Sequence, residues 1–256
     1  MNLANMMDYH HFPIYSVMIL FLGAFIIAAC GSKASKNPKN PAGFRAWIAL
    51  CATALSLFFL GSLVKPVMLE GEIISYWMGN WTPVSGIAIG IGYEIDALSL
   101  VFALLCVITT FLVVLYSVKY MEKDSHLGHY YTLLLMLAGS ILGLTMTGDV
   151  FNMFVMFEVS CFAGAALIAF RSNEDASVEA GLKYLLLDSI GSKLLLLGIA
   201  LVYLQTRTLN MAQIASILRN NLTPLSVFGF ALMMVLAECN NGEPVKLKDV
   251  AERTGV

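Results

Sequence analysis

One acidic residue lies deep inside an apolar stretch, and it strongly limits what this chain can fold into. Glu158 comes eight residues after Val150 in the apolar run from Val150 to Phe170. An α-helix rises ~1.5 Å per residue, so the carboxyl would lie roughly 12 Å from one end of a membrane-spanning helix. A charge at that depth costs roughly 2.5 to 3.5 kcal/mol on insertion scales, and such groups usually face a protein or water-filled interior. The position therefore predicts a proton or ion site.

The composition places the whole chain in a membrane. Of its 256 residues, 59% are apolar and 12% are charged, and the mean hydropathy is +0.78. A soluble domain has about 45 to 50% apolar and ~25% charged residues. The net charge of -2 gives no excess of cations to neutralise phosphates, which excludes nucleic acid as a partner of the whole chain.

Seven apolar stretches predict an all-α membrane protein, a polytopic bundle of about seven transmembrane helices. A hydrocarbon core of ~30 Å needs about 20 apolar residues per helix, and the seventh stretch is too short to span alone. The stretches are Pro13 to Cys30, Ala46 to Val64, Ala97 to Val118, Tyr131 to Thr147, Val150 to Phe170, Leu182 to Leu204 and Pro224 to Ala237.

Basic residues predict which ends of the helices face the cytoplasm. They gather after the first, third and fifth stretches, whereas the first twelve residues contain none. By the positive-inside tendency, we expect a multi-pass protein of the cell membrane with its N-terminus outside. The inside connectors would carry Lys33, Lys36, Lys39, Arg45, Lys119, Lys123 and Arg171, the inside tail Lys246, Lys248 and Arg253, and the outside connectors Lys65, Arg207 and Arg219.

The connector from Lys65 to Asp96 is the longest between two stretches. It holds aromatic residues of the kind found at membrane boundaries, namely Tyr76, Trp77, Trp81 and Tyr93. Its glycines, Gly86, Gly90 and Gly92, lack the strand-turn-helix context of a dinucleotide site and are interpreted as a turn leading into the third stretch.

Cysteine and histidine patterns give no support for a metal or cofactor site. The five cysteines, Cys30, Cys51, Cys106, Cys161 and Cys239, contain no CxxC pair and are interpreted as small core residues. Metal binding near His126 and His129 is conceivable but disfavoured, because these histidines share their connector only with Glu122 and Asp124. Ile27 to Cys30 resembles a lipoprotein cleavage box, but no basic residue precedes it as an export signal requires. We therefore expect no cofactor and no metal.

The sixth stretch adds three charges to the membrane interior. Lys183 lies at its start, Asp188 follows, and Lys193 falls near its centre. A basic group facing Glu158 would favour the ionised carboxylate, and protonation of one partner would weaken the hold on the other, as a proton relay requires. The simpler alternatives are a boundary lysine at Lys183 whose ammonium reaches the headgroups, a static ion pair of Asp188 with Lys193, and a neutral, hydrogen-bonded Glu158.

Two further acidic residues stand where apolar stretches begin. Asp96 precedes the third stretch and Asp149 the fifth. A carboxylate is favoured at the positive end of a helix, so both are expected to cap helices rather than to carry protons.

Two motifs resemble a known family. The first is Gly92-Tyr-Glu-Ile-Asp-Ala-Leu-Ser-Leu-Val-Phe, and the second is Thr147-Gly-Asp-Val-Phe-Asn-Met-Phe-Val-Met-Phe-Glu-Val-Ser. They are similar to the antiporter-like subunits shared by respiratory complex I, Mrp-type sodium/proton antiporters and membrane-bound hydrogenases. A third stretch, Glu179-Ala-Gly-Leu-Lys-Tyr-Leu-Leu with Thr208-Leu-Asn-Met-Ala-Gln-Ile-Ala further on, most resembles the D-type component of Mrp antiporters.

The resemblance implies the first half of an antiporter-like fold within a larger complex. Glu158 would match the functional glutamate of the family's fifth helix, with Lys193, Asp188 and Lys183 as further candidates for proton transfer. The implied partners are other membrane subunits, the lipid bilayer, protons and possibly Na⁺, and redox centres would belong to other subunits. The expected division is a three-span segment over 1–130, an incomplete antiporter-like core over 131–237 and a polar tail over 238–256.

The chain departs from the family's pattern after its seventh stretch. Where the family has a lysine that pairs with the fifth-helix glutamate, this chain reads Glu238-Cys-Asn-Asn-Gly-Glu-Pro. Lys193 or Lys183 could substitute for that lysine. The segment from Val245 resembles the opening of a LacI-type helix-turn-helix but stops before any recognition helix, so we interpret it as a solvated cytoplasmic tail. A split, truncated or fused reading frame and a naturally short subunit both remain open.

Two functions from different classes fit these observations. The leading one is translocation of protons, or exchange of sodium for protons, coupled to redox chemistry in partner subunits or to an ion gradient. The alternative is a non-conducting structural or assembly subunit, because the seventh-helix lysine is absent. No nucleophile-base pair supports catalysis by this chain alone, so an enzymatic role would be that of a membrane subunit in a complex of the NADH dehydrogenase or hydrogenase type.

Overall fold

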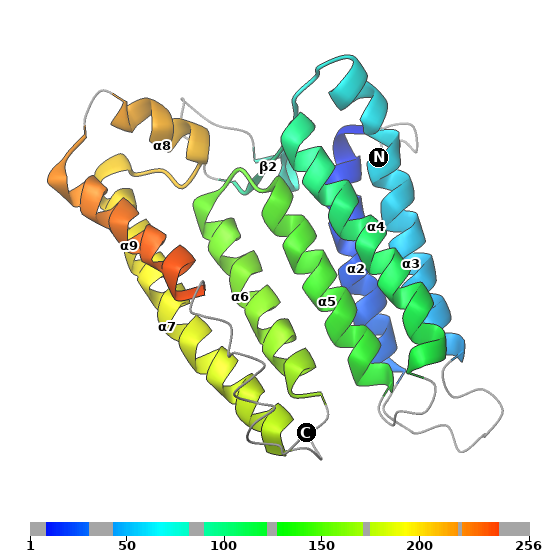
Figure 1. Ribbon diagram of the computed structural model, residues 1–256. Coiled ribbons are helices and arrows are strands. Elements are labelled where there is room, and N and C mark those ends of the chain that lie inside the picture. Colours follow the sequence, from blue (N-terminus) through cyan, green and yellow to red (C-terminus); the bar gives the residue numbers. More distant parts are fainter. Residues whose placement is uncertain are drawn as a thin grey trace.

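The computed structural model describes residues 9–30, 43–81, 90–121, 127–170, 175–219 and 222–240. Within these ranges six helices are long and apolar enough to cross a membrane. They are α2 (Phe12–Ala29), α3 (Gly43–Ser62), α4 (Ala97–Tyr120), α5 (Leu127–Met146), α6 (Val150–Ile168) and α7 (Asp175–Thr206) (Figure 1). The prediction of an all-α polytopic membrane protein is confirmed.

Two shorter helices complete the described chain. α8 (Met211–Leu218) lies at one end of the bundle, and α9 (Pro224–Asn240) packs along α7 (Figure 1). The apolar run of α9, from Pro224 to Ala237, is shorter than a membrane span, as the sequence indicated for the seventh stretch. α7 is longer than predicted, because its helix begins at Asp175 rather than at Leu182.

The long helices stand side by side, and each packs on its neighbours. α2 packs on α3 and α5, α4 packs on the same two helices, and α6 lies between α5 and α7. A large buried core joins α2 to α5, with Leu20, Tyr131 and Leu135 fully enclosed, and a smaller core joins α6 to α9. Small residues allow close helix contact, since a Cβ atom at Gly198 of α7 would lie 2.6 Å from the carbonyl oxygen of Gly229 of α9.

A short hairpin occupies the connector between α3 and α4. After a turn of π-helix (Lys65–Leu69), strand β1 (Ile74–Trp77) pairs antiparallel with β2 (Gly92–Ile95), and a 3-10 turn (Met78–Asn80) follows β1. The interpretation of Gly92 as part of a turn is wrong: it belongs to β2, where the ring of Trp77 lies 3.3 Å from the position of a Cβ atom. Gly86 lies outside the described residues.

The aromatic side chains of this connector do not all lie at the surface. Trp81 is exposed, as expected at a membrane boundary, but Tyr93 is only 1% exposed and belongs to the main core. Strand pairing causes the difference, because β2 passes over the ends of the helices and alternates its side chains between the core and the outside.

Three connectors meet at the start of α6 and hold that helix in place. The backbone N–H of Gly148 donates to the carbonyl of Gly92 at 2.9 Å, and the N–H of Val150 donates to Leu209 at 2.9 Å. Isolated bridges also pair Tyr93 with Thr147 and Asp149 with Asn210. Segments far apart in sequence thereby fix the end of the helix that carries Glu158.

Side-chain caps begin the helices where the sequence predicted them. Asp96 forms a capping box with Ser99 before α4, and hydrogen bonds from the Ser99 backbone and side chain lower the pKa of Asp96. Asp149 accepts from the N–H of Asn152 at 2.8 Å before α6, and burial raises the pKa of Asp149. The prediction that both residues cap helices is confirmed.

Candidate proton-transfer site

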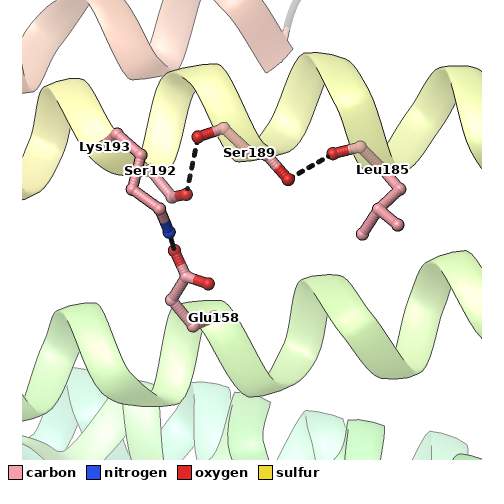
Figure 2. Close-up of polar contacts among 5 residues, drawn as sticks. All are labelled: Glu158, Leu185, Ser189, Ser192 and Lys193. Atoms are coloured by element: carbon pink, nitrogen blue, oxygen red, sulfur yellow. Dashed lines mark hydrogen bonds and ion pairs between the residues drawn. The ribbon is translucent and has the colours of Figure 1, made fainter.

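Glu158 and Lys193 form an ion pair between two membrane-spanning helices. Lys193 Nζ on α7 donates to Glu158 Oε1 on α6 at 2.7 Å (Figure 2). The Glu158 side chain is 18% exposed and the Lys193 side chain 62%. A pairing that the sequence offered only as one possible substitution is therefore present in the folded chain.

Close packing of α6 and α7 brings the two charges within reach. A Cβ atom at Gly181 of α7 would lie 2.7 Å from Cβ of Ala169, just after the end of α6, and 3.1 Å from the carbonyl oxygen of Ala165. Small residues at this crossing let the two backbones approach, as in other membrane helix pairs. The short connector over residues 171–174 joins the same ends of α6 and α7 but lies outside the described residues, together with Arg171.

The lysine ammonium also lies near an aromatic face. Lys193 Nζ is 5.8 Å from the ring centroid of Phe154, one turn before Glu158 on α6. A cation over an aromatic ring is attracted by the ring quadrupole. The sequence placed Phe154 beside Glu158 only as an apolar neighbour, so the contact with the cation was missed. The sequence signal for this contact is that Phe154 stands four residues before Glu158, on the same face of the helix.

Two serine hydroxyls line α7 on the side of Glu158. Ser192 Oγ donates to the carbonyl of Ser189 at 3.2 Å, and Ser189 Oγ donates to the carbonyl of Leu185 at 2.6 Å. Figure 2 shows both along the same stretch of α7, with Ser192 beside the Glu158 carboxylate. The Ser189 hydroxyl proton goes to its own helix, whereas the Ser192 hydroxyl lies within hydrogen-bonding reach of both the Ser189 carbonyl and the Glu158 carboxylate.

Asp188 lies in the same helix interface but does not meet Lys193. Its carboxylate neighbours the thiol of Cys161 on α6 and the ring of Tyr184. Within the described part of the chain, Asp188 Oδ2 is buried without a hydrogen-bond partner. The alternative of a static Asp188–Lys193 pair is not what the structure shows, because five residues along a helix turn the two side chains to different faces.

Lys183 lies apart from this cluster. It forms an ion pair with Glu179 one turn earlier on α7, and both side chains are more than half exposed. This position near the start of α7 fits the alternative of a boundary lysine. The structure therefore brings Glu158 and Lys193 together, places Asp188 nearby and leaves Lys183 outside the site.

A second group of polar side chains, at the start of α6, was not predicted from the sequence. Asn152 is buried and donates from Nδ2 to Thr147 Oγ1 at 2.9 Å, and Tyr93 lies close enough to interact with Asn152. Asn152, Thr147 and Tyr93 all belong to the two motifs quoted above. The signal that could have revealed this group is Asn152, a polar residue inside an apolar stretch. This group supports the connectors that hold α6.

The described residues do not form a metal site. Among the ranges given above, no three His, Cys, Asp or Glu side chains come together as a metal ion would require. Cys30, Cys51, Cys106 and Cys161 are free thiols. His126, Glu122 and Asp124 lie outside the described residues. That metal binding near His126 is disfavoured therefore stays a prediction.

The chain matches two family profiles in the order expected from its motifs. Residues 81–131 match the N-terminus of chain 5 of NADH-ubiquinone oxidoreductase (complex I), and residues 147–239 match the transmembrane family of NADH:quinone oxidoreductase and the Mrp antiporter. The chain belongs to the antiporter-like subunit family of complex I and Mrp antiporters. The predicted family is confirmed, whereas the finer resemblance to the D-type component of Mrp antiporters stays a prediction.

Curated relatives of this antiporter-like subunit include Na(+)/H(+) antiporter subunit A1 of Staphylococcus aureus. It is 30% identical over 192 residues, which are 74% of this chain but 23% of the relative. The same protein from several strains, among them JH9 and Newman, matches equally well. The chain therefore spans about a quarter of the length of these relatives.

Two solved membrane complexes contain chains with the same fold. A chain of the membrane-bound sulfane sulfur reductase, an archaeal respiratory membrane complex, superposes with a TM-score of 0.76 at 28% identity, over 86% of this antiporter-like subunit and 43% of the other chain. A chain of the Mrp complex from Dietzia sp. DQ12-45-1b gives 0.74 at 22% identity over 89% and 40%. The second likeness shows the fold alone. The chain spans less than half of either structure's matched chain.

Proposed function

We propose that this chain is part of a membrane subunit that translocates protons, or exchanges sodium ions for protons, within a multisubunit complex. The proton-handling groups of this proposal are Glu158 and Lys193. The observation that carries it is the 2.7 Å contact between Lys193 Nζ and Glu158 Oε1, on two helices that are each long enough to cross the membrane. A carboxylate and an ammonium at that depth are costly and are kept mainly where they serve ion movement.

The geometry of the pair couples the two charges. At hydrogen-bond distance each charge stabilises the ionised form of the other, so a proton that arrives on Glu158 loosens the hold on the Lys193 ammonium. A change in the charge of either group therefore changes the proton affinity of its partner. This property allows a protonation event to be passed along a membrane.

Lys193 is proposed to take the role of the lysine that is missing from the seventh stretch. It comes from α7, the sixth membrane-spanning helix, and reaches Glu158 without any contribution from α9. The relay would continue through the hydroxyl of Ser192 and the carboxylate of Asp188 toward the start of α7. Asp188 fits this role because one of its oxygens is buried, with no hydrogen-bond partner among the described residues. Lys183 would mark the end of the path at the membrane boundary.

The remaining parts of the proposal follow from the sequence. We propose a cell-membrane location with the N-terminus outside, which makes the start of α7 the cytoplasmic end of the path. The three-part division into 1–130, 131–237 and 238–256 is kept as a prediction. The coupling would be to redox chemistry in other subunits or to an ion gradient.

Substitution of Glu158 by Gln tests the proposal. The amide keeps the size of the side chain and removes the charge, so proton flux should fall roughly tenfold or more while the complex still assembles. The measurement is proton movement, followed with a pH-sensitive dye in membrane vesicles that contain the assembled complex. Glu70→Gln is the matched control, since Glu70 forms an exposed ion pair with Lys65 outside the site.

The outcomes separate the two candidate functions. Lost flux with normal assembly supports translocation through Glu158. Unchanged flux in the Glu158→Gln variant would contradict the proposal and favour a non-conducting structural subunit.

A further inference from the structure

Phe154 lies between the ion pair of the candidate site and the smaller buried core. Its ring packs against that core, to which α7 contributes Leu195, Ile199 and Val202. The ammonium of Lys193 lies over the same ring, 5.8 Å from the ring centroid. Apolar packing therefore anchors a ring whose π-system meets a charge.

The relative heights of α6 and α7 explain why the ammonium reaches this ring. At the crossing, Gly181 of α7 faces residues 165–169 at the end of α6, and the two helices run in opposite directions (Figure 1). Both rise ~1.5 Å per residue, so the twelve residues from Gly181 to Lys193 carry the lysine to a level of α6 between Phe154 and Glu158. A helical side chain leans toward the start of its own helix, which for Lys193 is the direction of Glu158.

The two attractions that hold the ammonium respond differently to a proton. The attraction of Glu158 depends on its negative charge and weakens when the carboxylate is protonated. The attraction of the ring comes from the quadrupole of its π-system, which does not change with the protonation of Glu158. While the carboxyl is neutral, the ring of Phe154 thus still draws the ammonium toward its place in the ion pair.

A second phenylalanine on α6 offers a matched comparison. Phe162 stands four residues after Glu158, as Phe154 stands four residues before it, so both share a helix face with the carboxylate. Among the described residues, the ring under the Lys193 ammonium is that of Phe154 and not that of Phe162. The position of the cation, rather than the aromatic spacing, therefore distinguishes the two rings.

We propose that Phe154 is a positioning residue, which keeps the Lys193 ammonium within reach of Glu158 while that carboxyl is protonated. This inference rests on the proposed function, in which a proton arrives on Glu158. Lysine carries its charge on a flexible four-carbon stem, so without the ring the ammonium would leave the site at each neutral stage. With the ring in place, the ion pair re-forms as soon as the proton leaves.

Fluorination of the ring tests this role at nearly constant size. Fluorine atoms draw electron density from the ring face and weaken its attraction for a cation. Phenylalanines with one, two or three ring fluorines are incorporated at Phe154, and proton flux is measured in vesicles that contain the assembled complex. Flux should fall with each fluorine, by about two- to fivefold for three, as expected for the loss of one cation–π contact. The same series at Phe162 should leave flux unchanged.

Two ordinary substitutions complete the flux test. Phe154→Tyr keeps an aromatic face for the cation and should retain most of the flux. Phe154→Leu keeps an apolar side chain without that face and should lower flux at least as much as three fluorines do. Equal flux in these two variants would contradict a role for the ring face.

The contact itself is measured without transport. The thermal unfolding midpoint of the chain in the purified complex should fall with each fluorine at Phe154. In the Lys193→Met variant, which keeps an unbranched stem without the charge, the midpoint should not respond to fluorine. The comparison is a double-mutant cycle, which isolates the interaction between the two side chains.

Three results would overturn the inference: flux that is independent of fluorine at Phe154, equal losses for fluorine at Phe154 and Phe162, or an unfolding midpoint that responds to fluorine equally with and without the charge of Lys193. A failure of the proposed function is recognised separately. Unchanged flux in the Glu158→Gln variant contradicts that function, whereas lost flux in Glu158→Gln with a flat fluorine series at Phe154 contradicts the positioning role alone.

Discussion

At the scale of single residues, the pairing of Glu158 explains how a carboxylate is tolerated within the membrane. The carboxylate accepts from Lys193 and lies beside Ser192, while the aromatic ring of Phe154 faces the ammonium. Opposite charges at this distance reduce the cost of moving each from water, although they rarely remove it. The remaining cost is consistent with a pair kept for function.

Lys193 and Lys183 differ in their partners, and this gives a residue-level prediction. Lys193→Ala should lower proton flux roughly tenfold or more, because Glu158 loses the charge that holds it ionised. Lys183→Ala should leave flux within about twofold of the wild type, since Lys183 pairs with the exposed Glu179 and such pairs contribute little. Dye-based flux assays on vesicles with equal amounts of complex measure both. Equal losses in the two variants would show that the contact with Glu158 is not the deciding feature.

At the scale of secondary-structure elements, α6 depends on the connectors at its start. The N–H groups of Gly148 and Val150 bond to two other connectors, and the Asp149 side chain caps the helix from a buried position. The cap satisfies one of the N–H groups that every helix start leaves unpaired. These contacts at the start of α6 thus set the height of Glu158 relative to the neighbouring helices.

Substitutions at Asp149 separate capping from charge. Asp149→Asn keeps the acceptor oxygen for the N–H of Asn152, whereas Asp149→Ala removes it and should cost about 1 kcal/mol of stability. Burial raises the pKa of Asp149 above its ordinary value of 3.8, so folding favours the protonated carboxyl. The stability that the folded state gains from this proton is fully present when the pH is below the ordinary pKa of the carboxyl. That stability is lost as the pH rises through the folded-state pKa.

The thermal unfolding midpoint in detergent measures this effect. As the pH is lowered from about 8 toward about 4, the unfolding midpoint of the wild type should rise relative to that of Asp149→Asn. The amide does not titrate and serves as the reference at each pH. A difference that is constant across this range would contradict the link to Asp149 protonation.

At the scale of the whole molecule, the ends of the helices sort into two sides. The hairpin and α8 lie at one end, and the start of α7 lies at the other (Figure 1). If the N-terminus is outside, Glu72 beside the hairpin faces the exterior and Glu179 faces the cytoplasm.

Cysteine labelling tests this orientation. In intact cells a membrane-impermeant maleimide should label Glu72→Cys above the wild-type background set by the native cysteines. It should label Glu179→Cys only after the membrane is opened. The reverse pattern would show that the chain is inserted the other way round.

The sequence predicted the helices and the position of the key carboxylate well, for a local reason. A run of about 20 apolar residues forms a spanning helix wherever it occurs in a membrane, because its backbone groups must bond within the run. Asp96 and Asp149 could be predicted as caps on the same local grounds. The burial of Tyr93 and the pairing of Gly92 in a strand could not, because they depend on a hairpin whose strands are far apart along the chain.

The amino-acid sequence alone determined the family and the membrane class, and it placed Glu158, Asp188 and Lys193 inside apolar helices, since each of these is read along the chain. Only the tertiary structure decided that Lys193, rather than Lys183, meets Glu158, and that Asp188 turns away toward Cys161. The physical reason is that contacts between helices depend on which faces pack and at what height. Small residues such as Gly181 set that packing, and hydropathy does not reveal it.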